Sequence, residues 1–166
     1  MSIDYIQATV RQKIPADCLA GIEKWLLTRI FKTEERGDSL VFHGCWEYHG
    51  HSVSPDDELT ETLTASREIC PELCAAVEHA INKSKEVEGW INFERIFQSI
   101  VQRHPDLLHH VSIELHHVSI EEVHCNTKHG PFREILTIIT AQCIMSINSD
   151  GAERNGPIAW ITPYPD

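Results

Sequence analysis

The sequence predicts a single α+β domain, residues 1–166, in which a mainly antiparallel sheet of about four to five strands packs against three helices. Three observations favour this class. Some segments alternate apolar and polar residues, as half-buried strands do, and others repeat apolar residues at helical spacing. No linker or low-complexity tract divides the chain, which is long enough to bury one sizeable core. The predicted strands include residues 3–13, 39–51 and 132–148, and the predicted helices are residues 15–32, 66–83 and 92–103.

The first half of the chain is predicted to form a strand, a helix and a second strand. Pro15 opens the helix, and its apolar face is made by Leu19, Ile22, Leu26 and Ile30. Glu34–Asp38 is predicted to be a turn, since it contains a glycine. The strand over residues 39–51 has an aromatic face that is expected to be buried, with Phe42, Trp46 and Tyr48. Its other face carries Val41, His43, Cys45, Glu47, His49 and His51.

The second half is predicted to be helical first and extended later. Residues 54–57 have turn chemistry, so Glu58–Thr64 is predicted to return as a short edge strand. In the helix that follows, Cys70 and Cys74 are interpreted as core thiols. The next helix begins at Asn92, a plausible cap, and ends before Pro105. A turn at 126–131 leads into the long strand 132–148, and the last dozen residues are expected to be an extended tail that docks on the domain or on a neighbour.

Residues 108–121 consist of one seven-residue unit, LHHVSIE, repeated without change. On a strand, an odd repeat turns the second copy's apolar residues to the opposite face, unless a bulge or turn near His116–His117 resets the register. On a helix, seven residues are nearly two turns, and the apolar residues would form a narrow seam. Because each unit is made of weak helix formers, we favour a bulged strand or a hairpin.

The net charge of −11 limits the classes of partner. It argues against direct binding to nucleic acid or anionic membranes and favours a basic protein partner. No apolar run is long enough to span a bilayer, and the N-terminus lacks a signal-like segment, so we expect a cytoplasmic protein. The six cysteines are therefore expected to be reduced.

Candidate chemistry lies in the stretch Cys45-Trp46-Glu47-Tyr48-His49-Gly50-His51-Ser52. On a strand, His49 and His51 project from the same face, which allows two imidazoles to bind one zinc ion. A catalytic zinc needs three protein ligands, so a further group must come from elsewhere, such as His43 or the histidines of the repeat.

The string C-x-x-x-H-G-H-S, followed by Gly89-Trp90-Ile91-Asn92-Phe93 and Leu108-His109-His110, resembles in order the motifs of the 6-pyruvoyl- and 6-carboxy-tetrahydropterin synthases of the tunnelling fold. The resemblance covers three short patches. It implies a zinc-dependent synthase acting on a pterin-like substrate, with Cys45 as the catalytic thiol, His110 as the relay histidine, and His49 and His51 as zinc ligands. The first predicted strand has no histidine where that family takes its third ligand, and His109 stands where the family has Asp.

Three functions are consistent with these features. The preferred one is non-enzymatic: an acidic domain, without a cofactor, that binds a basic protein as inhibitor or immunity proteins do. The alternative is the zinc-dependent tunnelling-fold enzyme, and a third is a histidine-rich metal or pH sensor. An exposed strand edge would also allow a homo-oligomer.

Overall fold

The computed structural model describes residues 4–46, 50–83, 89–104, 118–141, 143–150 and 158–163, with backbone only at 45–46, 132, 143, 145, 147–150 and 158–163. The described helices are α1 (Gly21–Ile30), α2 (Asp57–Ser66), α3 (Pro71–Lys83) and α4 (Phe93–Arg103), besides a 3-10 turn at Ala16–Cys18. The described strands are β1 (Asp4–Val10), β2 (Ile14–Pro15), β3 (Lys32–Arg36), β4 (Ser39–Trp46), β5 (Gly50–Ser52), β6 (Trp90–Asn92), β7 (Val118–Asn126), β8 (Gly130–Ile139), β9 (Cys143–Asp150) and β10 (Ile158–Pro163).

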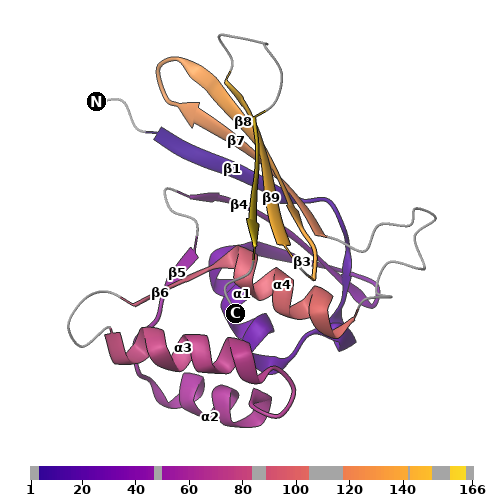
Figure 1. Cartoon of the computed structure of the whole chain (residues 1–166), viewed down its shortest axis with the longest axis vertical. Helices are drawn as coiled ribbons and strands as arrows, with labels where there is room; N and C mark the ends of the chain where they lie inside the picture. The colour runs from indigo at the N-terminus through magenta and orange to yellow at the C-terminus, as the bar shows by residue number, and fades with distance from the viewer. Residues whose placement is uncertain are drawn as a thin grey trace.

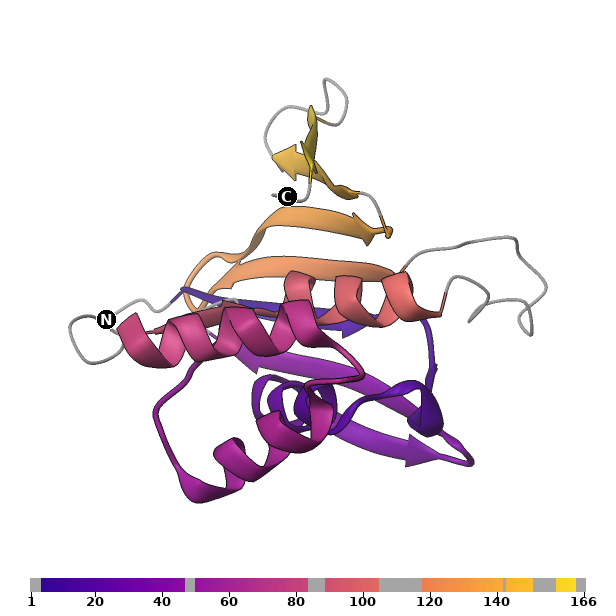
Figure 2. The same ribbon diagram turned by 60° about the horizontal axis from the view of Figure 1, so that its bottom comes forward.

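Eight of the described strands form one antiparallel sheet in the order β10-β9-β8-β7-β1-β4-β2, with β3 on the other edge of β4. Strands β5 and β6 form a separate two-stranded sheet. The helices lie together on one side of the large sheet, and β9 and β10 extend beyond them (Figures 1 and 2). The predicted α+β class with a mainly antiparallel sheet is confirmed, with more strands and one more helix than expected.

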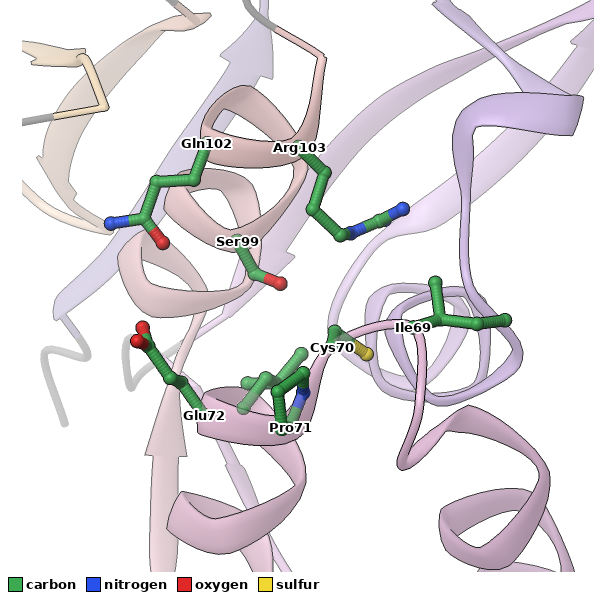
Figure 3. Close-up of a pocket in the computed structure, with 8 residues that line it drawn as sticks. Ile69, Cys70, Pro71, Glu72, Ser99, Gln102 and Arg103 are labelled. Atoms are coloured by element: carbon green, nitrogen blue, oxygen red, sulfur yellow. The ribbon is translucent and has the colours of Figure 1, made fainter.

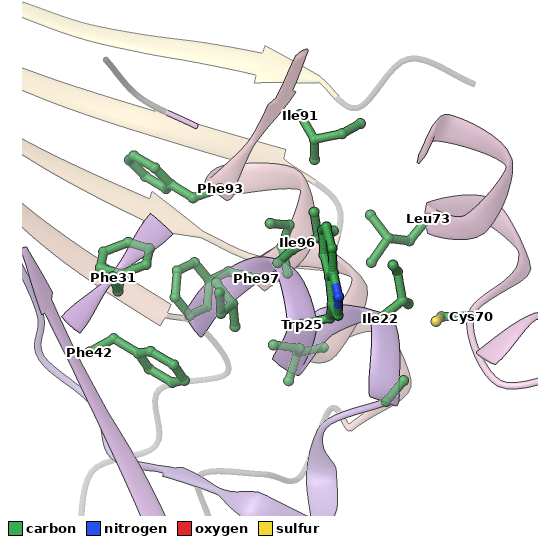
Figure 4. Close-up of a cluster of buried hydrophobic side chains, with 14 of the residues drawn as sticks. Ile22, Trp25, Phe31, Phe42, Cys70, Leu73, Ile91, Phe93, Ile96 and Phe97 are labelled. Atoms are coloured by element: carbon green, nitrogen blue, oxygen red, sulfur yellow. The ribbon is translucent and has the colours of Figure 1, made fainter. Parts of the chain in front are cut away.

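The core lies between the helices and the sheet, and aromatic rings fill its centre. Phe31 packs edge-on against Phe42, Phe93 and Phe97, with ring centroids 5.5–6.0 Å apart (Figure 4). The prediction that Phe42 faces the core is confirmed, since it is fully buried. Such edge-to-face pairs add to the area that each ring buries. Within the described residues, no helix is long and apolar enough to cross a membrane.

The first strands follow the sequence pattern closely. Strand β1 lies within the predicted segment 3–13, but the helix predicted from Pro15 begins only at Gly21. The turn predicted over Glu34–Asp38 is shorter, because β3 continues to Arg36 and pairs with β4. Only Gly37 and Asp38 separate the two strands, and Gly37 has φ +64°, which a side chain would disfavour.

The prediction of an edge strand at Glu58–Thr64 is wrong, because this segment belongs to helix α2. Its N-cap Asp56 accepts a hydrogen bond from the Leu59 amide at 2.6 Å, and the helix buries Leu59, Leu63 and Ser66 on one face. Its threonines do not pair strands but bond the carbonyls four residues earlier. A turn at 67–69 then separates α2 from α3, so the predicted helix over 66–83 begins later, at Pro71.

The strand predicted over 39–51 is also divided. Strand β4 ends at Trp46 and belongs to the large sheet, whereas Gly50–Ser52 forms β5 and pairs with β6 in the small sheet. The glycine at 50 is required there: a Cβ would lie 2.3 Å from the Ile91 carbonyl oxygen. His43 and His51 therefore do not share the face of one strand.

The C-terminal third forms consecutive hairpins. The second copy of the repeat supplies the start of β7, with Val118 and Ile120 buried, whereas 108–117 lie outside the described residues. The turn predicted at 126–131 is confirmed and joins β7 to β8. The long strand predicted over 132–148 is wrong, since β8 ends at Ile139 and β9 returns beside it. In the segment predicted to be an extended tail, 158–163 form β10 and pair with β9.

Candidate protein-binding surface

The histidines predicted to bind metal lie in separate surroundings. His43, on β4, has its Nε2 atom 2.9 Å from Oε1 of Glu34 on β3. This interaction lowers the pKa of Glu34, with a smaller contribution from Arg36. His43 thus forms a partly exposed hydrogen bond on the sheet, where the strand register sets its neighbours.

His51 instead belongs to an aromatic stack on α1. Its ring meets Trp25 edge-on, with centroids 6.0 Å apart, and the guanidinium of Arg29 lies 3.6 Å from the centre of the same indole. Burial, and then the charge of Arg29, lower the pKa of His51, so the imidazole is neutral at pH 7. This packing gives His51 a structural contact that the sequence pattern did not indicate.

The remaining predicted site residues are only partly described. Cys45 lies on β4 with its backbone opposite Gln7, and its side chain is not described. His49 and His110 lie outside the described residues. Among the residues that are described, no three His, Cys, Asp or Glu side chains are placed to hold a metal ion. The zinc site and the catalytic roles of Cys45 and His110 stay predictions.

A cavity of about 200 Å³ lies where the turn between α2 and α3 meets the C-terminal half of α4. Figure 3 shows Ile69, Cys70, Pro71 and Glu72 on one side and three polar side chains of α4 on the other. The lining residues are Ile69, Cys70, Pro71, Glu72, Leu73, Ser99, Gln102 and Arg103. The site therefore combines an apolar lip with a polar wall, as binding pockets commonly do.

The lip is shaped by the way in which α2 ends and α3 begins. The amides of Ile69 and Cys70 both donate to the Ser66 carbonyl, at 3.0 and 2.9 Å, which closes a tight turn after α2. Pro71 then takes the first position of α3, where its missing N–H costs nothing. This geometry leaves Ile69 50% exposed beside the cavity, although isoleucine is usually buried.

The polar wall is fixed by a buried carboxylate behind it. Glu23, at 0% exposure, accepts hydrogen bonds from the Ala20 amide at 2.8 Å and from Ser99 Oγ at 2.6 Å, and it forms an ion pair with Arg103. Arg103 also donates to the Cys18 carbonyl at 3.1 Å. The buried Nε of Arg103 has no hydrogen-bond partner among the described residues, which leaves one donor in the wall.

The thiol in the cavity resists ionisation. Burial, and then the charge of Glu23, raise the pKa of Cys70 to about 12. Its Sγ donates to the Ser66 carbonyl at 3.6 Å, and neighbouring Cys74 is buried as well. Thiol reactivity requires the thiolate, so Cys70 fills space here. The prediction that Cys70 and Cys74 are core thiols is confirmed.

Negative charge is concentrated on the α2–α3 hairpin, part of which lines the cavity. Residues 56–83, which include α2 and α3, carry seven acidic side chains against two basic ones, Arg67 and Lys83. This segment thus has a formal charge of −5, close to half of the −11 of the whole chain. The acidic side chains that are exposed are Asp56, Asp57, Glu58, Glu61, Glu68 and Glu72. A cationic partner would be steered toward this helical hairpin.

Sequence reasoning missed this surface for two reasons. The run of charge was visible, but acidic residues on a helix are usually only solvated, and half of the hairpin was predicted to be a strand. The polar wall comes from α4, which enters the site from a distant part of the chain. One signal was available: the sequence Ile69-Cys70-Pro71 places a large apolar residue just before a helix start, where it cannot join the helix's buried face.

Comparisons with protein-family models, with curated proteins and with solved structures find no match to this chain.

Proposed function

We propose that this protein acts by binding another protein with a basic surface, through the α2–α3 hairpin and the adjacent cavity. One observation carries the proposal: an exposed isoleucine and an apolar-lipped cavity lie within a field of exposed carboxylates. An apolar anchor surrounded by charge is typical of protein interfaces, in which a few buried contacts supply most of the affinity.

Each part of the surface has a distinct role in this proposal. The cavity receives an apolar side chain of the partner, whose burial is worth about 1.5–3 kcal/mol. Glu68 and Glu72 flank the lip and contact Lys or Arg side chains beside the anchor, so they set the association rate and its salt dependence.

The test compares two variants with the same change of charge. The probes are nine-residue peptides with a central Leu, Phe or Trp, flanked by Lys and Arg or, as controls, by Glu. We expect the wild type to bind the basic peptides in fluorescence anisotropy. Glu68→Gln/Glu72→Gln should weaken binding about fivefold at low salt, because each exposed charge contact contributes about 0.5 kcal/mol. Glu35→Gln/Asp38→Asn, at the exposed end of the β3–β4 hairpin, should change it less than about twofold.

A third variant separates the anchor from the charge. Ile69→Ser removes exposed apolar surface and should weaken the peptides with an apolar centre, while leaving the charge field unchanged. The proposal is wrong if the wild type binds acid-flanked and basic peptides equally, or if both charge variants weaken binding to the same extent. An inhibitor or immunity-type role corresponds to a partner that is itself a basic enzyme whose active surface the hairpin covers.

A further inference from the structure

A second cluster of ionisable groups lies at the opposite end of α4, between this helix and the sheet. Glu122, on β7, is 3% exposed. Its neighbours across the sheet are Ala8 on β1 and Ile135 on β8, at directly opposed positions. Cross-strand neighbours share a face of the sheet, so the Glu122 carboxyl lies in an apolar row on the side that the helices cover (Figure 2).

Glu94 adds a second carboxyl with a buried oxygen, on the helix that contacts β7. It stands in the first turn of α4, between the fully buried Phe93 and Phe97 in the sequence. Its Oε2 atom is buried, with no hydrogen-bond partner among the described residues. A buried carboxylate without partners is costly, whereas a protonated carboxyl in the same position is neutral and can donate.

The charged groups of the surrounding elements are few. On β7, His124 lies two residues beyond Glu122, with Nε2 at 3.8 Å from Oε2 of Glu122. Arg133 on β8 lies opposite His124, and Arg95 follows Glu94 on α4. The facing positions of β1 are apolar, Ile6 and Ala8.

We propose that Glu94 and Glu122 form a proton-binding site, in which α4 docks on the sheet while the pair holds at least one proton. The charges of the two carboxyls act on each other, so they cannot both ionise without repulsion, and release of the proton opposes the docking of the helix. The helix N-terminus favours a charged Glu94, but burial of the group outweighs this local effect.

The electrostatics of the site agree with its geometry. Burial, and then the charge of Glu94, raise the pKa of Glu122 to about 8, and burial raises the pKa of Glu94 to about 7. Burial, and then the charge of Arg133, lower the pKa of His124, so the imidazole stays neutral near pH 7. Both carboxyl pKa values lie above the unfolded value of 4.5. The stability that the bound protons give is complete below about pH 4.5 and is lost as the pH rises through 7–8.

The decisive measurement is the titration of the two side chains by carboxyl ¹³C NMR, assigned with Glu94→Gln and Glu122→Gln. We expect both carboxyls to titrate above pH 6. The unfolding constant of the wild type, from urea denaturation, should rise at least tenfold more than that of Glu122→Gln between pH 5.5 and 8.5. Glu35→Gln, on the exposed side of β3, should follow the wild type.

Two results would overturn the proposal: titration of both carboxyls near the ordinary glutamate value, or a pH dependence that neither Gln variant alters. If Glu122→Gln does not fold, the wild-type titration together with Glu94→Gln still decides, because the signals of the wild type do not depend on that variant.

Discussion

Glu23 shows how one side chain can join three parts of the chain. Its carboxylate accepts from the backbone before α1, from Ser99 on α4 and from Arg103 at the end of α4. A buried ion pair of this kind adds little when compared with a well-packed apolar pair, but the loss of one partner leaves the other charge buried. The residue therefore sets the position of α4 against α1 and, with it, the polar wall of the cavity.

Replacement of Glu23 by Gln should reduce the free energy of unfolding by about 2–3 kcal/mol, because Arg103 loses its counter-charge. Urea denaturation at pH 7 measures the change. Glu34→Gln is the matched control: it breaks the solvent-screened contacts with Arg36 and His43 and should change the stability far less than Glu23→Gln does. If the two variants lose equal free energy of unfolding, the buried Glu23–Arg103 pair contributes no more to stability than the exposed contacts of Glu34.

Single residues were the hardest features to predict from the sequence. The pattern placed His43 and His51 on one strand face, but Gly50 lies at the start of a second sheet, and the two imidazoles have separate partners. The burial of Glu122 could not be predicted, because it depends on which residues of β1 and β8 lie opposite. Register is a long-range property, and local alternation does not determine it.

Among the elements, α2 is a helix where the sequence pattern predicted a strand. Three threonines, at 60, 62 and 64, are compatible with a strand, but all three lie in α2. Their hydroxyls are satisfied by the preceding turn of the helix. The capping aspartate at 56 and the spacing of Leu59 and Leu63 were the helix signals, and they outweigh β-propensity when the apolar face is buried.

The N-cap of α2 can be tested by substitution. Asp56→Ala removes the acceptor for the Leu59 amide and should cost about 1 kcal/mol of stability. Asp57→Ala removes the same charge one position later without removing the cap, and should cost less than half as much. Thermal melts of both variants measure the difference. If the order of the two losses is reversed, the cap is not what starts the helix.

The predicted strand over 132–148 failed for a different reason. Its apolar alternation continues on both sides of a chain reversal, so the pattern contains no break where β8 ends at Ile139. Two helix-borne contacts mark the reversal: Gln98 and Gln102 of α4 donate to the carbonyls of Thr140 and Ala141, at 3.1 and 3.0 Å. The signal for this turn therefore lies in another element.

At the scale of the molecule, the fold class was predictable, and the arrangement of its surfaces was not. The spacing of apolar residues identified the α+β class, because some segments alternate apolar and polar residues as strands do, and other segments have the apolar spacing of helices. It could not show that the helices gather on one side of the sheet, nor that nearly half of the excess negative charge lies on one helical hairpin. The cavity and the Glu94–Glu122 pair lie at opposite ends of α4, so one helix connects the proposed binding surface to the proposed proton-binding site.

The identical copies in residues 108–121 bear on heritable changes in the length of the chain. Removal of either copy gives the same sequence, and the remaining LHHVSIE still supplies Val118, Ser119, Ile120 and Glu121 to β7. The connection from α4 would shorten from fourteen residues to seven, which still span about 23 Å when extended.

We expect the variant lacking 108–114 to fold and to keep the amide NMR signals of β7, whereas Ile120→Asp, at a fully buried position, should unfold the domain. Loss of the β7 signals in the deletion variant would show that the first copy is needed for the strand. If they are retained, a lineage can gain or lose a whole unit here without disturbing the sheet, so that length at this point is free to vary between otherwise equivalent proteins.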